Sequence, residues 1–545
     1  MSEPSAAILS LERLGVRLPP GADRSHALSD VSLSIAANEI LCIVGESGSG
    51  KSIMANAIMR LLPSEVSIDS GRVMFEGRDL ATASTAEMRS VRGAGIAMIF
   101  QEPMTALNPL RTIGDQIGEM FSIHTGLSGA AIRTKVLALL EDVRIPDPKS
   151  AARAYPHELS GGQRQRAMIA MALALDPRIL IADEPTTALD VTTQAQILAL
   201  VRDLQKRKKT AVVFITHDFG VVAEIADRVA VMQHGSIVEQ GDAASILNDP
   251  QHPYTKQLIA AVPPLTSPPP RKLSDDIILT IDNVSKTYRT GGFLGRGARV
   301  TPAVRDVSLK LPRGATLGIV GESGSGKSTL ARCIVRLIDP DIGSIVLDGK
   351  DWAKMTREDV RRETRHIQMV FQDPFASLNP RRKAGDLVAQ GPIVHGAPRA
   401  KAIAEAKELF ALVGLDPSAI DRFPHEFSGG QRQRIGLARA LALRPSVLVA
   451  DEAVSALDVS VQAQVLKLLA GLRQRLGLSI VFITHDLRVA AQICDLVAVM
   501  KDGEVVEQGL AGDVFGRPRH PYTQALLESI PGGDFARRRE ARLLA

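Results

Sequence analysis

The chain contains the stretch Gly45-Glu-Ser-Gly-Ser-Gly-Lys-Ser52 twice, the second time as Gly321-Glu-Ser-Gly-Ser-Gly-Lys-Ser328. Each copy follows a short apolar run of strand type and precedes a stretch with helical spacing, at residues 53–62 and 329–338. Glycines let the backbone N–H groups of such a loop surround phosphates, and the helix that follows adds its positive end. The sequence therefore predicts two phosphate-binding loops, each between a strand and a helix.

The rest of the chain repeats with the same order of motifs. The loop lysines Lys51 and Lys327 are 276 residues apart, and two later histidines, His217 and His485, are 268 apart. Between the copies, the stretch 263–270 contains five prolines, which exclude a helix or a central strand. As an extended chain, the linker would span roughly 40 Å, enough to cross a domain face. We predict a first nucleotide-binding domain with a C-terminal extension at 1–262, a linker at 263–276, a second such domain at 277–530 and a basic tail at 531–545.

Apolar runs in both copies are typical of strands buried on both faces of a sheet. They alternate with helical stretches, which predicts a mainly parallel α/β sheet in each copy. Hydrophobic residues make up 45% of the chain and aromatic residues only 3%, so we expect aliphatic side chains to fill the cores. The further runs lie at 179–182, 211–215, 447–450 and 479–483.

Charge, cysteine spacing and apolar run lengths limit the kinds of protein that this chain can be. The 65 basic and 60 acidic side chains give a net charge of +5, which predicts an ordinary solvated surface, with a face held near anionic membrane lipid as the alternative. The basic cluster at residues 537–542 is typical of a solvated chain end, so we expect no nucleic-acid partner. The cysteines Cys42, Cys333 and Cys494 lack metal-ligand spacing. The N-terminus does not resemble a signal peptide, and the apolar run at 167–175 is too short to span a bilayer. We expect a soluble protein, or one held at a membrane by a partner.

Each copy carries residue types that suit ATP hydrolysis. The loop lysine would reach the β- and γ-phosphates, and the loop serine would bind Mg²⁺. An aspartate that ends a buried strand would help to hold Mg²⁺, and the glutamate after it would polarise the attacking water. The residues in these four roles are Lys51, Ser52, Asp183 and Glu184 in the first copy and Lys327, Ser328, Asp451 and Glu452 in the second.

A further motif, Leu159-Ser-Gly-Gly-Gln163, recurs as Phe427-Ser-Gly-Gly-Gln431. It resembles the signature of ATP-binding-cassette (ABC) proteins, and the resemblance covers essentially the whole chain. It implies two tandem P-loop NTPase domains, each with a mainly parallel sheet core, an antiparallel β subdomain and a helical signature subdomain. It also implies that Glu184 and Glu452 act in catalysis together with switch histidines, His217 and His485.

In proteins of this family, the signature of one domain closes on the ATP held by the other domain's phosphate loop. The resemblance therefore implies two composite sites, with ATP and Mg²⁺ as the bound groups. The implied metal-binding residues are Ser52, Gln101, Asp183, Ser328, Gln372 and Asp451. The implied nucleotide-binding residues are Gly45, Ser47, Gly48, Gly50, Lys51, Ser52, Gln101, Ser160, Gly161, Gly162, Gln163, Tyr288, Gly321, Ser323, Gly324, Gly326, Lys327, Ser328, Thr329, Gln372, Ser428, Gly429, Gly430 and Gln431.

The segments His252-Pro-Tyr-Thr255 and His520-Pro-Tyr-Thr523 resemble the C-terminal extension of the peptide/nickel branch of ABC importers. The resemblance implies a fused ATPase that energises import of peptides or peptide-like solutes, at the cytoplasmic face of the inner membrane. It implies two membrane-spanning permease subunits as partners and, indirectly, an extracytoplasmic solute-binding protein. Coupling helices of the permeases would contact residues 102–107 and 373–378.

Two departures from the family pattern stand out. No cysteine cluster follows either copy, so we expect no iron–sulfur centre. Tyr288 occupies the place of the aromatic residue that stacks on adenine, whereas the matching stretch 14–18 contains no aromatic residue. A lost stacking contact would weaken ATP binding at the first site by about 1–3 kcal/mol.

The identity of the cargo stays open at this point. Nickel or another small solute is an alternative to peptides within the same branch. A translation-associated ABC ATPase is a further alternative, although the proline-rich linker and the His-Pro-Tyr-Thr segments argue against it.

Overall fold

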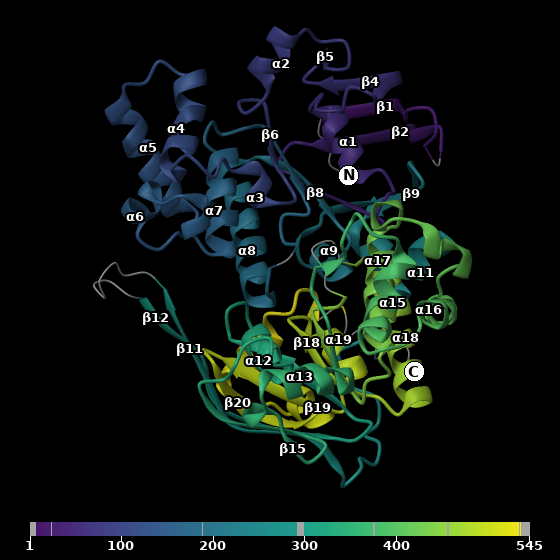
Figure 1. Ribbon diagram of the computed structural model, residues 1–545. Coiled ribbons are helices and arrows are strands. Elements are labelled where there is room, and N and C mark those ends of the chain that lie inside the picture. The colour runs from purple at the N-terminus through teal and green to yellow at the C-terminus, as the bar shows by residue number, and fades with distance from the viewer. Residues whose placement is uncertain are drawn as a thin grey trace. The chain divides into compact units, whose positions relative to one another are not determined.

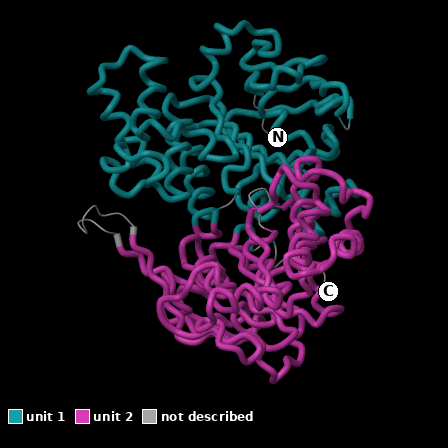
Figure 2. Tube along the Cα trace, viewed as in Figure 1, with its two compact units in different colours: residues 1–189, 193–262, 531–545 teal, residues 190–192, 263–530 magenta. Residues whose placement is uncertain are grey.

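The computed structural model describes residues 7–22, 24–187, 189–290, 299–373, 377–454, 457–533 and 535. It divides into two compact units, shown in different colours in Figure 2. Unit 1 comprises residues 1–189, 193–262 and 531–545, and unit 2 comprises residues 190–192 and 263–530. Most of the predicted basic tail lies outside the described residues.

The core of unit 1 is a six-stranded sheet (Figure 1). Its central strands are continuous apolar runs, and they are buried at every residue because the sheet is covered on both faces. All neighbours pair in parallel except the edge strand β10, which is antiparallel to β9. In spatial order the strands are β10 (Ser236–Asp242), β9 (Arg228–Gln233), β3 (Ile40–Val44), β8 (Ala211–Thr216), β7 (Ile179–Asp183) and β6 (Ile96–Ile99).

A second sheet of unit 1 is antiparallel and packs on the core sheet through one hydrophobic cluster, to which Leu11, Val31 and Ile43 belong. Its strands, in spatial order, are β2 (His26–Ala36), β1 (Ala7–Arg17), β4 (Ser67–Phe75) and β5 (Arg78–Asp79).

The helices of unit 1 fall into three groups. Those beside the sheets are α1 (Lys51–Ile58), α2 (Thr85–Val91), α8 (Val191–Lys208) and α9 (Phe219–Ile225). The helical subdomain contains α3 (Pro103–Ala106), α4 (Ile113–His124), α5 (Gly129–Asp142), α6 (Pro148–Arg153) and α7 (Gly161–Ala172). The C-terminal extension contains α10 (Ala243–Asn248) and α11 (Pro253–Ala261).

Unit 2 repeats both sheets. The core sheet has the order β16 (Ile367–Val370), β17 (Val447–Asp451), β18 (Ser479–Thr484), β13 (Thr316–Val320), β19 (Leu496–Lys501) and β20 (Glu504–Leu510). The antiparallel sheet has the order β12 (Arg299–Pro312), β11 (Ile277–Thr290), β14 (Ile342–Leu347) and β15 (Lys350–Asp351).

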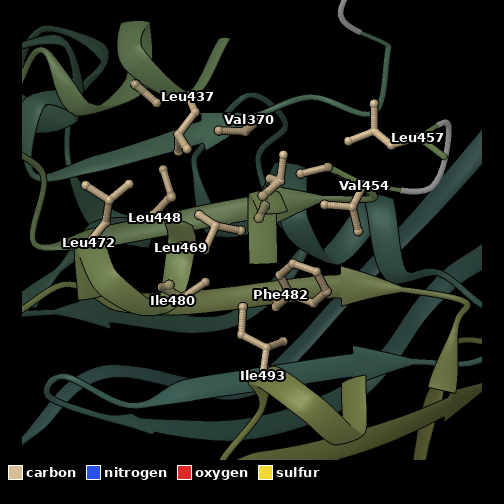
Figure 3. Packing of buried hydrophobic residues seen from close by; sticks show 14 of the residues in the cluster. Val370, Leu437, Leu448, Val454, Leu457, Leu469, Leu472, Ile480, Phe482 and Ile493 are labelled. Atoms are coloured by element: carbon tan, nitrogen blue, oxygen red, sulfur yellow. The ribbon is translucent and has the colours of Figure 1, made fainter. Parts of the chain in front are cut away.

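The helices of unit 2 also follow the pattern of unit 1. In chain order they are α12 (Lys327–Ile334), α13 (Arg357–Glu363), α15 (Ala384–Val394), α16 (Arg399–Leu412), α17 (Gly429–Leu441), α18 (Val459–Leu476), α19 (Leu487–Ile493), α20 (Ala511–Gly516) and α21 (Pro521–Glu528). Figure 3 shows how the core forms, with Leu448 and Phe482 on strands facing apolar side chains such as Leu469 on a helix.

The linker packs against unit 2, and is not an extended chain without contacts. The Gln492 side-chain amide donates hydrogen bonds to the carbonyl oxygens of Pro264 and Thr266, at 3.0 and 2.9 Å. The Arg271 guanidinium binds both carboxylate oxygens of Asp495, at 2.6 and 2.7 Å. These contacts fix both ends of the proline-rich stretch on one unit.

The predicted α/β fold with two P-loop domains is confirmed, but the first helices are shorter than predicted. Helix α1 ends at Ile58 instead of residue 62, because Arg60 takes a left-handed conformation with φ of 50° and Pro63 follows. Helix α12 ends at Ile334 for the same reason, with Arg336 at φ of 56°.

Candidate nucleotide-binding sites

In each unit, the phosphate loop joins a central strand to a helix at the carboxyl edge of the core sheet. In α/β sheets this edge is where ligands bind. Gly50, which precedes α1, has a left-handed φ of 106°, and an added Cβ would lie 2.9 Å from the carbonyl oxygen of Ala27. Gly326 in unit 2 has a φ of 101°, and its Cβ would lie 2.1 Å from that of Ala303. Both positions therefore require glycine.

The loop lysines are buried and point back along their own loops. The Lys51 ammonium donates to the carbonyl oxygens of Gly45 and Glu46, at 2.7 and 2.8 Å. Lys327 makes the equivalent bonds to Gly321 and Glu322, at 2.8 and 2.7 Å. Each loop thus holds a positive charge at its centre, where an anion would be attracted.

Next to each lysine, a serine and an aspartate bring two oxygen donors together. The Ser52 hydroxyl donates to Asp183 Oδ1 at 3.1 Å, and Ser328 donates to Asp451 Oδ1 at the same 3.1 Å. Burial raises the pKa of both aspartates, although the serine bonds partly offset it. A buried carboxylate beside a hydroxyl suits a hard cation, which would compensate the buried negative charge.

The glutamate after each aspartate forms a pair with the histidine predicted as the switch. His217 Nδ1 lies 3.4 Å from Glu184 Oε1, and His485 Nδ1 lies 3.3 Å from Glu452 Oε1. Burial alone would raise the pKa of Glu184, but the hydrogen bond and charge of His217 outweigh burial and lower it to about 2. Glu184 is therefore ionised at neutral pH.

The second glutamate pair behaves in the same way. Burial would raise the pKa of Glu452, but His485 outweighs burial and lowers it. Burial would lower the pKa of His485, but Glu452 outweighs burial and raises it. Each partner therefore stabilises the charged form of the other.

Both glutamates have strained backbones and the same glutamine neighbour. Glu184 and Glu452 take φ of 46° and 47°, a left-handed conformation that costs a residue with a side chain about 1–3 kcal/mol. The Gln101 amide donates to Glu184 Oε2 at 3.1 Å, and the Gln372 amide donates to Glu452 Oε2 at 2.6 Å. Each unit thus brings loop, aspartate, glutamate, glutamine and histidine together.

The signature motifs lie at the N-termini of α7 and α17. Ser160 caps α7 by accepting the N–H of Gln163 at 3.3 Å, and Ser428 caps α17 in the same way with Gln431 at 3.3 Å. A Cβ on the second signature glycine, Gly162, would lie 2.7 Å from Thr193 Cγ2. The motif therefore places a serine and two glycines at a helix N-terminus, which attracts anions.

On the side of the loop expected to hold the base, the units differ. Tyr288 is half-buried on β11. In unit 1 the matching residue is Leu18, and the nearby Arg24 guanidinium donates to the carbonyl oxygen of Gly48 in the phosphate loop at 2.7 Å. Sequence reasoning did not predict this arginine contact, because it found only a missing aromatic residue.

Sequence reasoning also missed a role for the His-Pro-Tyr-Thr segments beyond marking a branch. The Glu46 backbone N–H donates to Tyr254 Oη at 3.1 Å, and the Glu322 N–H donates to Tyr522 Oη at 3.2 Å. The only signal in the sequence was the recurrence of the motif in both copies.

Comparison with known proteins identifies the family. The family model described as "ABC transporter" matches residues 28–187 and 304–455. This chain belongs to the ABC transporter family. A second model, "Oligopeptide/dipeptide transporter, C-terminal region", matches residues 238–278 and 506–544 of this ABC ATPase, which include both His-Pro-Tyr-Thr segments.

Similar proteins cover nearly the whole ABC ATPase. Among them are proteins named "Glutathione import ATP-binding protein GsiA" from Escherichia coli strain K12 and Pectobacterium atrosepticum. The first is 45% identical over 98% of this chain and 92% of its own length. The second is 44% identical over 99% of this chain and 92% of its own length.

These matches confirm the peptide-type importer branch and ATP hydrolysis as the activity of the chain. The chain is an ATP-binding import subunit, and its family implies membrane permease partners. The peptide-transporter region in both units also argues against the translation-associated alternative. Among the helices within the described ranges, none is both long enough and apolar enough to cross a bilayer.

Proposed function

We propose that this ABC ATPase drives the import of glutathione or a closely related small peptide, with ATP and Mg²⁺ bound at two sites. The observation that carries the proposal is the complete set of lysine, serine, aspartate, glutamate and histidine in both units. The near full-length similarity to proteins named for glutathione import supports the choice of cargo. Both sites are therefore candidates for turnover.

The proposed chemistry of each site follows from the charges in place. In the first site, Lys51 would leave the loop carbonyls for the β- and γ-phosphates, and Ser52 and Asp183 would hold Mg²⁺. When bound, Mg²⁺ neutralises charge on the phosphates. Glu184, ionised at neutral pH, would accept a hydrogen bond from the water that attacks the γ-phosphate. His217 would exchange its contact with Glu184 for one with the γ-phosphate.

We propose that each site is completed by the signature of the other domain. Ser428 with its glycines would close on ATP at Lys51, and Ser160 with its glycines on ATP at Lys327. A capped helix N-terminus of this kind is chemically suited to a γ-phosphate. In a Lys327→Ala chain, Ser428→Arg should abolish retention of ATP at the Lys51 site, whereas Ser160→Arg should leave it unchanged. The reverse result would contradict the composite arrangement.

A cavity in unit 2 supports docking of a permease coupling helix. Its volume is about 430 Å³. Its wall includes Ser377, which belongs to the predicted coupling segment 373–378. Residues 374–376 of that segment lie outside the described residues. The apolar lining residues are Val335, Leu337, Ile367, Met369, Phe371, Leu387, Val394 and Leu443.

The same apolar positions are exposed in both units. Val394 is 75% and Leu337 59% exposed in unit 2, and Ile123 is 68% and Leu61 40% exposed at the matching positions of unit 1. Exposed apolar patches that recur at matched positions indicate a partner surface. Val394→Asp together with Ile123→Asp should therefore abolish import while the purified chain still hydrolyses ATP. Unchanged import would contradict this docking surface.

We also propose that the chain lies at the cytoplasmic face of the inner membrane, and that an extracytoplasmic protein delivers the cargo to the permeases. The cargo is tested by uptake in cells that lack this chain, complemented by wild type or by a Glu184→Gln, Glu452→Gln double variant. Labelled glutathione, a dipeptide, a pentapeptide and nickel are separate arms. Glutathione uptake restored by wild type alone supports the proposal. Restoration of only nickel or only longer peptides would move the assignment to that cargo.

A further inference from the structure

The C-terminal extension of each unit contacts the phosphate loop of the same unit through a tyrosine hydroxyl. The two bonds, Glu46 N–H to Tyr254 Oη and Glu322 N–H to Tyr522 Oη, are 3.1 and 3.2 Å long. They join residues that are 208 and 200 positions apart in the sequence. We propose that Tyr254 and Tyr522 are positioning residues that hold the phosphate loops in the shape that accepts ATP.

The rest of the motif explains how the tyrosine is aimed. On β10, the Glu239 carboxylate accepts the backbone N–H groups of Gln251 and His252, at 2.7 and 3.2 Å. His252 Nδ1 accepts the N–H of Tyr254 at 3.2 Å, so the histidine caps the N-terminus of α11. Pro253 occupies the first helical position, where no N–H donor is needed.

Unit 2 builds the same arrangement from its own residues. The Glu507 carboxylate on β20 accepts the N–H groups of Arg519 and His520, at 2.8 and 3.1 Å. His520 Nδ1 accepts the N–H of Tyr522 at 3.1 Å. We call this arrangement the tyrosine brace. A glutamate on the sheet fixes the histidine, the histidine caps the helix, and the tyrosine of that helix bonds the phosphate loop.

Packing leaves each tyrosine little freedom to move. Tyr254 is only 6% exposed and belongs to the hydrophobic core of unit 1, and Tyr522 is half-buried and packs against the core of unit 2. The Lys501 ammonium lies 4.9 Å from the centre of the Tyr522 ring, a cation–π contact. Because the rings are fixed, their hydroxyls define where the second residue of each loop must lie.

This brace bears on ATP binding because a phosphate loop must lose conformational freedom when it wraps a triphosphate. A loop that is already held in place loses less, so it binds more tightly. The tyrosine hydroxyls bond the second residue of each phosphate loop, whereas the glutamate–histidine pairs lie after the core strands β7 and β8 in unit 1 and β17 and β18 in unit 2. The brace should therefore affect affinity and leave the catalytic step nearly unchanged.

The test uses the full chain with one site disabled. In a Lys327→Ala background, Tyr254→Phe keeps the ring and removes only the hydroxyl. We expect ATP and inorganic tripolyphosphate to bind the Lys51 site about fivefold more weakly, the equivalent of one hydrogen bond at about 1.4 kcal/mol per tenfold change. Tyr522→Phe in a Lys51→Ala background should have the same effect on the Lys327 site.

A second readout separates positioning from plain structural support. With both lysines intact, the Tyr254→Phe, Tyr522→Phe chain should show an about fivefold higher KM for ATP at unchanged kcat. Tyr155→Phe is the control, because its exposed ring stacks on His157. Unchanged affinity with a lowered Tm would overturn the proposal and leave a structural role only. Tighter binding would also overturn it, because the hydroxyl would then compete with phosphate for the loop N–H. Neither readout depends on the cargo.

Discussion

The two units have the same serine–aspartate and glutamate–histidine pairs beside the phosphate loop, and different residues at the position expected to contact the base. The serine–aspartate distance is 3.1 Å in both, and the histidine–glutamate distances are 3.4 and 3.3 Å. Where unit 2 has Tyr288, unit 1 has Leu18, and the nearby Arg24 side chain donates a hydrogen bond to the Gly48 carbonyl oxygen of the loop. The comparison indicates that the residues beside the phosphates are constrained in both units, whereas the residue expected to contact the base differs between them.

The antiparallel sheets also differ between the units, in the residues that bind one matched aspartate. Asp69 in unit 1 binds His26 at 2.9 Å and Arg17 at 3.2 Å, and these bonds lower its pKa. Asp341 in unit 2 binds Lys286 and the N–H of Thr287, both at 2.7 Å, which lowers its pKa in the same direction. The negative charge of the aspartate is therefore compensated in both units, by different partners.

The largest expected effect concerns the glutamates, whose geometry is alike in both units. The Glu184→Gln, Glu452→Gln chain should lose ATP hydrolysis by about 100-fold or more, because the amide cannot polarise the attacking water as a carboxylate does. The two single variants should lose equal rates. Steady-state ATPase assays of the three chains at saturating ATP measure this, and unequal single losses would break the equivalence of the sites.

The next effect concerns a carboxylate with more partners in unit 2 than in unit 1. Asp495 accepts the Thr316 N–H at 2.7 Å and pairs with Arg271 and the largely buried Arg473. Its counterpart Asp227 accepts the Ile40 N–H at 2.8 Å. Asp495→Asn should destabilise the start of β13 by about 2 kcal/mol, less than the full value of a buried pair because Arg271 is partly exposed.

Hydrogen exchange of peptides that cover β13 and β3 measures this difference locally. Asp227→Asn is the matched control, and we expect its effect on β3 to be about 1 kcal/mol, the value of one weakened hydrogen bond. Equal changes in the two strands would show that the ion pairs of Asp495 with Arg271 and Arg473 add no stability to unit 2.

A smaller effect concerns adenine. Tyr288→Leu, which copies unit 1 into unit 2, should weaken ATP binding at the Lys327 site by about tenfold, since stacking is worth about 1–3 kcal/mol. Leu18→Tyr should strengthen binding at the Lys51 site. Fluorescence titration with an ATP analogue, in chains with the other site's lysine replaced by alanine, measures each. Loss of tripolyphosphate affinity in Tyr288→Leu would contradict a base contact.

The smallest effect concerns pH. The pKa of Glu452 is lowered, so its contribution to stability is present above about pH 4.3 and is lost as pH falls through the lowered value. The pKa of His485 is raised, so its contribution is present below about pH 6.5 and is lost as pH rises through the raised value. The pair should therefore stabilise unit 2 most between about pH 4.3 and 6.5.

Hydrogen exchange at the ends of β17 and β18, measured from pH 6 to 9 without nucleotide, tests this loss. We expect protection from exchange to decrease as pH rises through the raised pKa of His485. His485→Gln should flatten the pH dependence, and an unchanged slope in that variant would assign it to other groups. In unit 1, Glu184 should keep its contribution until pH falls towards about 2.

The sequence was sufficient to predict the core sheets and the strand–loop–helix setting of both phosphate loops, because these depend on local patterns. Buried runs such as residues 40–44 specify strands, and the loop that follows has a fixed backbone. The tyrosine brace and the linker contacts could not be predicted, because they depend on which distant surfaces meet. Tyr254 lies 208 residues from Glu46, and no pattern near either residue indicates the other. The end of α1 was missed because the left-handed turn at Arg60 uses a residue that is common inside helices.

The most direct test of the central claim, two ATP sites alike at the phosphates and different at the base, is a paired titration. Full-length Lys327→Ala and Lys51→Ala chains are titrated with Mg-ATP and with magnesium tripolyphosphate. We predict that tripolyphosphate binds both chains equally and that ATP binds the Lys51→Ala chain, which retains the Tyr288 site, about tenfold more tightly. Equal ATP affinities, or unequal tripolyphosphate affinities, would contradict the account.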